Sequence, residues 1–550
     1  MFSDKENVNI LTSLLIAHSV RHAVVCPGSR NAPIVHNLDA CGSIHCYPVT
    51  DERSAGFYAL GLCQAVNAPV VVCVTSGTAL LNLCPSVAEA FYQHLPLVVI
   101  SADRPAQWID QLDGQTLPQV GALGRFVSKT VNLPEPHDEE SRWYCNRLIN
   151  EAMIACVKGS CGPVHINVPI TEPLYQFNTN TLPIERKVTF LSGLSDFNAA
   201  SVQCFQPIVT ALKHAQKPLI IIGQMKTSVV ISTHVERLIS QQHVVLYEPL
   251  GVDKGDNCLE ETMCLIGDKK EFLPDFILYF GDTFVSKRLK AFLRKAKKAE
   301  CWIVNPEGVL YDTFMNLTGI AQAEPKDIMQ AIDFQGNTEW FNLWENMKQH
   351  VRKHCMVFEP HYSNMLAVKQ LEALLSNNPS EAIVHYANST SIRLGCIYAR
   401  HHIFCNRGVN GIEGSLSTAA GYSLATKEQV FCIIGDLSFF YDQNALWNQN
   451  LGGNLRILLL NNHGGEIFAK FEGLKQSPVR NRIVMAEHAA TAEGICRDNR
   501  IKYYAANDIQ TLEKLLYVLV KEKSECPMLL EVFTDAETDL QIYQEYLNTL

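Results

Sequence analysis

Oxygen-bearing side chains follow two apolar segments in the last third of the chain. Asp436 comes directly after VFCIIG, and Asn462 comes directly after RILLLN. Both segments are typical of buried parallel strands, and ligands bind at the carboxyl edge of such sheets. An Asp carboxylate, an Asn amide oxygen and a nearby backbone carbonyl are ligands that Mg²⁺ prefers. A helix N-cap and a turn would use the same residues, so the spacing alone leaves a metal site and a structural role equally open.

These residues need a parallel sheet to bring them together, and strand and helix patterns alternate as such a sheet requires. Short apolar runs in the first third predict buried strands at 22–26, 69–74, 96–101 and 163–168. Amphipathic stretches beside them predict helices at 6–20, 52–66, 77–92 and 139–157. From residue 360 onward the same alternation predicts strands near 382–386, 403–405, 430–435, 456–460 and 528–533. The middle of the chain predicts strands at 217–223, 276–282 and 301–306.

We therefore predict an α/β protein of three domains, 1–182, 183–355 and 356–550. The boundaries follow a polar, Pro-containing segment at 177–190 and a Pro that interrupts the pattern within 354–364. The first and last domains also end alike, with VKGSCGP before VHINV and VKEKSECP before MLLEVF. This likeness predicts two copies of one parallel-sheet topology flanking a central α/β domain.

Composition and charge exclude several classes of protein. Hydrophobic residues make up 47% of the chain and charged residues 19%, as in globular proteins. No apolar run approaches the ~18 residues of a membrane span, and the N-terminus does not read as a signal peptide. A net charge of −10 argues against a nucleic-acid or anionic-membrane surface. The 19 cysteines contain no C-x-x-C pair and predict buried thiols in a reducing compartment, the cytoplasm.

The metal-ligand pattern resembles a known motif. Gly435-Asp436 followed by Asn461-Asn462 resembles the diphosphate-binding motif of thiamine-diphosphate (ThDP) enzymes, whose two cofactor domains share one topology and flank a central domain. That family also requires a first-domain glutamate, and the segment 51–56, DERSAG, resembles the one that carries it. The resemblance makes Glu52 the catalytic residue, which hydrogen-bonds the aminopyrimidine ring of the cofactor. Without the resemblance, Glu52 would suit an acidic residue that stabilises a helix N-terminus.

The resemblance implies a ThDP site made by both cofactor domains. The cofactor-binding residues that it implies are Glu52, Thr75, Gly77, Ser389, Ile412, Asp436, Leu437, Ser438, Asn462 and Ile467. The Mg²⁺ ligands that it implies, with Mn²⁺ able to substitute, are Asp436, Asn462 and the carbonyl of Gly464. Leu437 departs from the glycine that most family members have at this position.

Further motifs resemble one branch of the family, a decarboxylating synthase of menaquinone biosynthesis. They are CPGSRNAP (26–33), DERSAGFYALG (51–61), TSGTA (75–79), SADRP (101–105), SKRL (286–289), NRGVNGIEGSLST (406–418) and GDLSFFYD (435–442). The implied reaction is decarboxylation of 2-oxoglutarate, followed by addition of the succinyl-semialdehyde carbanion to isochorismate. The substrate-binding residues implied are Ser29, Arg30, Arg104, Gln115, Lys287, Arg288, Ser389, Arg393, Arg407 and Phe468.

The charge of these substrates explains the cations among the implied residues. Donor and acceptor each carry two carboxylates, and the chain is itself acidic. The site must therefore concentrate cations locally, preferably arginines that bind carboxylates bidentately. Any one of these cations taken singly would also suit a solvated surface ion.

Two alternatives remain open at this stage. One is another ThDP-dependent carboligase or decarboxylase of 2-oxo acids, of the acetohydroxyacid synthase type. The other is a non-catalytic binding protein on the same fold, against which the presence of Glu52, Asp436 and Asn462 argues. Family sites lie between two subunits, so the resemblance implies a homodimer at least and is compatible with a homotetramer. Small molecules are the expected partners, with no nucleic acid and no membrane.

Overall fold

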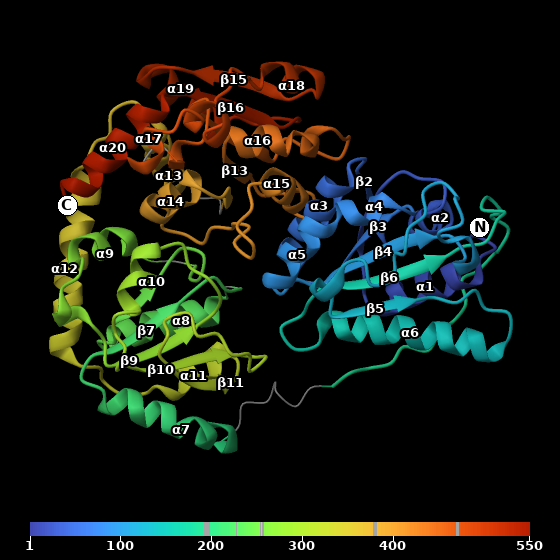
Figure 1. The fold of residues 1–550 in the computed structure, drawn as a ribbon, viewed down its shortest axis with the longest axis horizontal. Helices are drawn as coiled ribbons and strands as arrows, with labels where there is room; N and C mark the ends of the chain where they lie inside the picture. The colour runs from blue at the N-terminus through green and yellow to red at the C-terminus, as the bar shows by residue number, and fades with distance from the viewer. Residues whose placement is uncertain (192–198, 227, 254, 256–257, 378–381, 469–471) are drawn as a thin grey trace.

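Three parallel sheets organise the chain, and the predicted fold class is confirmed. A computed structural model describes residues 1–191, 199–226, 228–253, 255, 258–377, 382–468 and 472–550. Figure 1 shows three lobes, with the first sheet (blue to cyan) on one side and the central (green) and last (orange to red) sheets on the other. The residues at which the domains meet stay a prediction.

The first sheet has six strands in the order β2-β1-β3-β4-β6-β5. Its strands are β1 His22–Val25, β2 His45–Pro48, β3 Val70–Val74, β4 Leu97–Asp103, β5 Lys129–Asn132 and β6 Val164–Pro169. Its helices are α1 Glu6–Ala17, α2 Ala32–Ala40, α3 Glu52–Val66, α4 Thr78–Asn82, α5 Cys84–Tyr92 and α6 Glu139–Val157. Strands β3 and β4 are buried throughout, as expected for a parallel sheet covered on both faces. The helix predicted at 77–92 is two helices, because Pro85 starts a new one.

The last sheet has five strands in the order β12-β13-β14-β16-β15. Its strands are β12 Ile383–Tyr386, β13 Val430–Gly435, β14 Leu455–Asn461, β15 Lys502–Ala506 and β16 Met528–Phe533. Its helices are α13 Asn364–Ser376, α14 Thr390–Tyr398, α15 Ser415–Ser423, α16 Asp436–Tyr441, α17 Glu472–Lys475, α18 Glu493–Asp498, α19 Ile509–Lys521 and α20 Ala536–Asn548. In both sheets the two strands that come last in the sequence sit in reverse order at one edge, so the cofactor domains share one topology.

The strand predicted at 403–405 is reduced to a single bridge. Phe404 pairs with His385 of β12 in parallel, at the position that β2 holds in the first sheet. The backbone N–H groups of His402 and Ile403 donate instead to the carbonyls of Asp253 and Pro249 in the central domain. The ladder therefore cannot extend, because its neighbouring groups are used to join two domains.

The central sheet has five strands in the order β11-β10-β9-β7-β8. Its strands are β7 Pro218–Ile222, β8 Val245–Tyr247, β9 Phe276–Phe280, β10 Glu300–Asn305 and β11 Leu317–Gln322. Its helices are α7 Ala199–His214, α8 Val229–Ser240, α9 Leu259–Ile266, α10 Lys287–Leu293, α11 Pro325–Ala331 and α12 Thr338–Val357. Helix α12 leads from this domain to the last one along the edge of the molecule (Figure 1). Within the described residues, no helix combines the length and apolarity needed to cross a bilayer.

Helices α3 and α15 pack together and join the first domain to the last. A Cβ atom on Gly61 would lie 2.0 Å from the carbonyl oxygen of Thr418, and one on Gly421 would lie 2.1 Å from that of Tyr58. Only glycine allows two helix backbones to approach so closely. The Tyr58 hydroxyl also donates to the carbonyl of Ala445 at 2.5 Å. One apolar core therefore runs through both cofactor domains.

Candidate active site

Asp436 lies at the predicted sheet edge, where β13 ends and α16 begins. Its buried carboxylate accepts hydrogen bonds from the backbone N–H of Leu437 at 2.6 Å and of Gly464 at 2.9 Å. The second bond brings the loops after β13 and β14 into contact. Burial raises the pKa of Asp436, while the two backbone donors and the imidazole of His488, 3.4 Å away, lower it.

Asn462 has a fixed amide orientation. Its Nδ2 donates to Glu466 Oε2 at 3.0 Å and to Asp539 Oδ2 at 3.1 Å. Burial raises the pKa of Glu466 to about 8, so Asp539 is the acceptor that sets the NH₂ group on this side, and the amide oxygen Oδ1 points away from both acids. His463 follows with a positive φ of 63° and forms the turn that leads to Gly464.

The donors at this edge are of the type that suits Mg²⁺. They are one carboxylate on Asp436, one amide oxygen on Asn462 and the carbonyl of Gly464, on two loops that touch. In the described part of the chain, no cluster of three or more His, Cys, Asp or Glu side chains could hold a metal ion. A cation bound here would therefore rely on Asp436 for protein charge and on phosphate oxygens for the rest.

The other cofactor-binding residues predicted in the last domain lie beside this edge. The Ser438 hydroxyl donates to the carbonyl of Ile412, and the Ile412 side chain is 41% exposed despite being apolar. Ser389 starts α14 with a positive φ of 75°, and the neighbouring Asn388 donates to the carbonyl of Gly411 at 2.7 Å. Ile467 and Phe468 form a short turn after Gly465, with Phe468 partly exposed. Hydrogen bonds thus join the 406–412 loop to the starts of α14 and α16 at this edge.

Glu52 is the first residue of α3, but Asp51 caps the helix. Asp51 Oδ1 accepts from the backbone N–H of Arg53 at 2.9 Å and of Ser54 at 3.4 Å. The Glu52 carboxylate accepts instead from Asn82 Nδ2 at 3.2 Å. Asp51 therefore caps the helix, while Glu52 lies in its first turn, where an acidic side chain also stabilises the helix N-terminus. Among the described residues, Glu52 makes no hydrogen bond to the 435–438 segment of its own chain.

Thr75, Gly77 and Gln115 lie together at the carboxyl edge of the first sheet. The Gly77 N–H donates to Gln119 Oε1 at 2.7 Å, and a Cβ on Gly77 would lie 3.2 Å from the backbone of Gln115. Thr75 is buried against Gly28, on the loop that carries Ser29. A positive φ of 85° and this close approach both explain the glycine at position 77.

Arg30 and Arg104 converge on one carboxylate at this edge. Arg30 donates to the carbonyl of Ile170 at 3.0 Å and to Glu172 Oε1 at 2.9 Å. Arg104 lies 3.9 Å from the same Glu172 oxygen and donates to the carbonyl of Gly114 at 3.0 Å. The Glu172 side chain is 68% exposed. One carboxylate of the chain therefore lies within 4 Å of both guanidinium groups.

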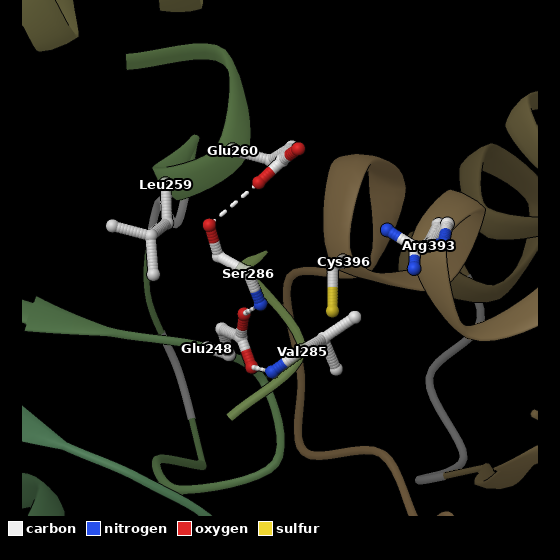
Figure 2. A pocket seen from close by; sticks show the side chains of 7 residues that line it. All are labelled: Glu248, Leu259, Glu260, Val285, Ser286, Arg393 and Cys396. Atoms are coloured by element: carbon white, nitrogen blue, oxygen red, sulfur yellow. Dashed lines mark hydrogen bonds between the residues drawn. The ribbon is translucent and has the colours of Figure 1, made fainter. Parts of the chain in front are cut away.

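A second group of cations lies between the central and last domains. Lys287 and Arg288 start α10, Arg393 lies on α14, and Arg407 lies on the loop before α15. Figure 2 shows a cavity lined by Glu248, Leu259, Glu260, Val285, Ser286, Arg393 and Cys396.

Acidic groups balance only part of this charge. Glu260 pairs with Arg288 and accepts from the Ser286 hydroxyl at 2.6 Å. Glu248 accepts from the backbone N–H of Val285 at 2.6 Å and of Ser286 at 2.8 Å, and burial raises its pKa to about 7.

Two arginines of this group keep donors without partners. The Nε atoms of Arg393 and Arg407 are buried and make no hydrogen bond, although Arg407 Nη1 donates to Asn388 Oδ1 at 3.0 Å. A buried donor without a partner lowers stability by about 1–3 kcal/mol. Such donors are suited to a ligand that supplies the missing acceptors.

The structure therefore divides the predicted substrate cations into two groups. Arg30 and Arg104 lie at the first sheet, whereas Lys287, Arg288, Arg393 and Arg407 lie at the boundary of the central and last domains. Neighbours of Glu52 contact the end of α16 and the turn that follows it: Arg53 donates to the carbonyl of Tyr441 at 2.8 Å, and Asn444 donates to Asp51 at 2.7 Å.

Sequence reasoning missed the residues that hold these groups in place. They are Glu172, Asn388, Glu466, His488 and Asp539. Glu466 and Asn388 stand beside predicted site residues in the sequence, so motif proximity could have indicated them. Asp539 lies on the last helix of the chain, where the sequence carries no signal for it.

Two parts of the chain match profiles of known protein families. Residues 6–122 match the N-terminal TPP binding domain of thiamine pyrophosphate enzymes, and residues 270–380 match the middle domain of thiamine pyrophosphate enzymes. Thiamine pyrophosphate is another name for ThDP.

Several curated proteins resemble the chain over its whole length. The 2-succinyl-5-enolpyruvyl-6-hydroxy-3-cyclohexene-1-carboxylate synthase of Bacteroides fragilis is 42% identical over 566 residues, covering 100% of both chains. The protein of the same name from Phocaeicola vulgatus is 42% identical, covering 100% of this chain and 99% of its own. The one from Flavobacterium johnsoniae is 33% identical and covers 97% of each.

Proposed function

The chain belongs to the ThDP-dependent 2-succinyl-5-enolpyruvyl-6-hydroxy-3-cyclohexene-1-carboxylate synthase family. We propose that it synthesises the compound that appears in its relatives' name. The chain decarboxylates 2-oxoglutarate and transfers the remaining four-carbon unit to isochorismate. The products are 2-succinyl-5-enolpyruvyl-6-hydroxy-3-cyclohexene-1-carboxylate and CO₂, in menaquinone biosynthesis. ThDP, when bound, supplies the carbon centre that accepts the 2-oxo acid and stabilises the charge left by CO₂.

The observation that carries this proposal is the pair of cation groups in an acidic protein. Arg393 and Arg407 present buried donors without partners, and Arg30 and Arg104 already converge on a carboxylate of the chain itself. 2-Oxoglutarate and isochorismate together carry four carboxylates, which need cationic partners in the site. Each charged hydrogen bond contributes about 1.5–3 kcal/mol to binding. A 2-oxo acid substrate without a distal carboxylate would leave some of these cations without a partner.

Cofactor binding in this proposal divides between the two cofactor domains. Glu52 would hydrogen-bond the pyrimidine ring nitrogen and share a proton with it. Asp436, Asn462 and the carbonyl of Gly464 hold Mg²⁺, for which Mn²⁺ can substitute, against the diphosphate.

The test is to incubate the protein with ThDP, Mg²⁺, 2-oxoglutarate and isochorismate and to identify the product by mass. Formation of the named product supports the proposal, and its absence with active cofactor-loaded protein contradicts it. Replacing 2-oxoglutarate with pyruvate separates the nearest alternative. If pyruvate serves as well, the dicarboxylate assignment is wrong and an acetohydroxyacid-synthase type of activity is favoured.

Substitution of Arg393 sharpens this test. Arg393→Ala removes a charged hydrogen bond, so kcat/KM should fall about 10- to 150-fold for the substrate that it binds, while ThDP affinity changes little. Arg497→Ala is the matched control, since Arg497 is 75% exposed and pairs only with the adjacent Asp498. A site built for a charged group discriminates against analogues lacking it, so pyruvate turnover should fall less if Arg393 holds the distal carboxylate.

We further propose a homodimer whose sites lie between subunits. Mixing inactive Glu52→Gln and Asp436→Ala chains after subunit exchange would then restore about a quarter of the wild-type activity, because half of the dimers are mixed and each contains one intact site. No recovery, with exchange verified by mass, would place each site within a single chain.

A further inference from the structure

The loop 406–412 carries two predicted site residues, Arg407 and Ile412, and its own domain holds it at both ends. Asn388 Nδ2 donates to the carbonyls of Asn406 and Gly411, both at 2.7 Å. The hydroxyl of Ser438 donates to the carbonyl of Ile412. These contacts fix the two ends of the loop and leave its middle, at 408–409, to another partner.

That partner is Glu89 of the first domain. Glu89 lies on α5 and is only 3% exposed. One carboxylate oxygen accepts from the backbone N–H of Gly408 at 2.7 Å, and the other accepts from that of Val409 at 2.7 Å. Gln93, which directly follows the last residue of α5, donates to the Glu89 carboxylate at 2.5 Å.

The loop is pressed against α5 at this point. A Cβ on Gly408 would lie 2.9 Å from Tyr92 Cβ and 3.0 Å from the carbonyl oxygen of Glu89. Glycine is therefore required at position 408 for the two backbone N–H groups to reach the carboxylate. Without Glu89, both N–H groups would lose their acceptor at a partly buried contact.

Among the described residues, hydrogen bonds to the loop account for the burial of this acid. An isolated carboxylate is costly to bury unless hydrogen bonds satisfy it. Among the described residues, the partners of Glu89 are two N–H groups of a loop from another domain and the glutamine that follows its own helix. The two N–H groups belong to Gly408 and Val409, the residues that directly follow Arg407.

We propose that Glu89 is a positioning residue that acts across the domain boundary. By binding the N–H groups of Gly408 and Val409, it holds Arg407 where a substrate carboxylate binds. Docking of the first domain onto the last and binding of substrate are thereby coupled. The substrate part of this statement rests on the proposed function, whereas the hold on the loop does not.

The hold on the loop is tested by hydrogen–deuterium exchange of the apo-protein, measured on peptides covering 404–412. Glu89→Ala removes both acceptors, and Glu89→Gln keeps the shape but turns an NH₂ group toward one of the two donors. Exchange in this segment should become at least about tenfold faster in both variants.

The matched control is Glu261→Gln. Glu261 is a buried glutamate that also joins two domains, through the hydroxyl of Tyr546, but it bonds no loop of the site. It should leave exchange at 404–412 unchanged. Unchanged exchange in both Glu89 variants, with the variants folded by circular dichroism, would overturn the proposal.

The coupling to Arg407 is tested by a double-mutant cycle. Glu89→Gln should raise the KM of one anionic substrate by about 10- to 100-fold with kcat little changed, and ThDP affinity should stay within about threefold. In an Arg407→Ala background the same change should have little further effect, because Glu89 acts through Arg407. Additive effects would overturn the coupling. If wild-type protein does not turn over the substrates at all, the proposed function fails, while the exchange experiment still decides the hold on the loop.

Discussion

Asp51 and Glu52 are adjacent acids whose surroundings divide two roles between them. Asp51 caps α3 and accepts from Asn444, so its carboxylate is fully used by the fold. The only hydrogen bond that the described residues offer the Glu52 side chain is the one from Asn82. An acid at a helix start that does not cap it is a candidate for chemistry.

Glu52→Gln should separate cofactor binding from catalysis. The amide is nearly isosteric, so ThDP should still bind, but loss of the acid should slow H/D exchange at C2 of the bound cofactor by about 10²- to 10⁴-fold. Asp51→Asn is the control, since an Asn also caps helices and should leave this exchange intact. An unchanged exchange rate in Glu52→Gln would mean that Glu52 only starts the helix.

Asp436→Ala should abolish Mg²⁺-dependent ThDP binding, because Asp436 supplies the only charge among the three proposed protein ligands, the other two being an amide oxygen and a backbone carbonyl. Asp436→Asn keeps the acceptor for Gly464 and tests the charge alone; its ThDP affinity should also fall. Calorimetric titration measures both. Asp442→Asn, at the other end of α16, is the matched control and should bind ThDP normally. Near-normal affinity in the Asp436 variants would contradict the metal assignment.

The pair of helices α3 and α15 is the element on which the joint between the cofactor domains depends. Gly61→Ala places a methyl group 2.0 Å from the carbonyl oxygen of Thr418, so the helices must move apart. Overpacking of this kind lowers the free energy of unfolding by about 1–3 kcal/mol. Gly473→Ala is the control, because nothing lies within 4 Å of its Cβ and alanine favours a helix. Thermal unfolding at one scan rate compares the three proteins, and equal Tm values would show that the helices tolerate a wider spacing.

Across the whole molecule, buried acids and buried histidines change the pH dependence of stability in opposite directions. Burial, with a smaller contribution from the charge of Asp51, raises the pKa of Asp442 to about 7. The backbone and hydroxyl hydrogen bonds from Ser417 and the charge of Arg53 oppose this shift. Burial lowers the pKa of His385 to about 3 and of His402 to about 4. The acid favours folding in its protonated form and the histidines in their neutral form, so the total pH profile of stability is a balance.

A difference measurement isolates Asp442. Its folded-state pKa lies above its unfolded value, so its contribution to stability is complete below about pH 4 and is lost as pH rises through 7. Asp442→Asn can keep both contacts with Ser417 and does not ionise. The stability of the variant relative to wild type should therefore increase between pH 5 and 7.5 by about 2–4 kcal/mol and then level off. Thermal unfolding across this range at constant ionic strength measures it, and a constant difference would contradict the raised pKa.

The amino-acid sequence was sufficient to predict the central strands and the chemistry of the loops that follow them. A strand with neighbours on both sides is buried on both faces, so β3, β4, β13 and β14 appear as continuous apolar runs. The five strands that the sequence did not reveal, β2, β5, β8, β11 and β15, are all edge strands. An edge strand pairs on one side only and needs no continuous apolar run. The predicted strand at 403–405 was wrong for a related reason, because the central domain takes its hydrogen bonds.

How the loops meet depends on the folded chain and could not be predicted. The residue types at Asp436, Asn462 and Glu52 follow from local chemistry, which the sequence carries. The division of the cations into two groups, the orientation of Asn462 by Asp539, and the hold of Glu89 on Gly408 do not. Each of these depends on a contact between segments that are far apart in the chain. Hydrophobic periodicity reports whether a residue is buried within its own element, but it does not report which distant group completes its hydrogen bonds.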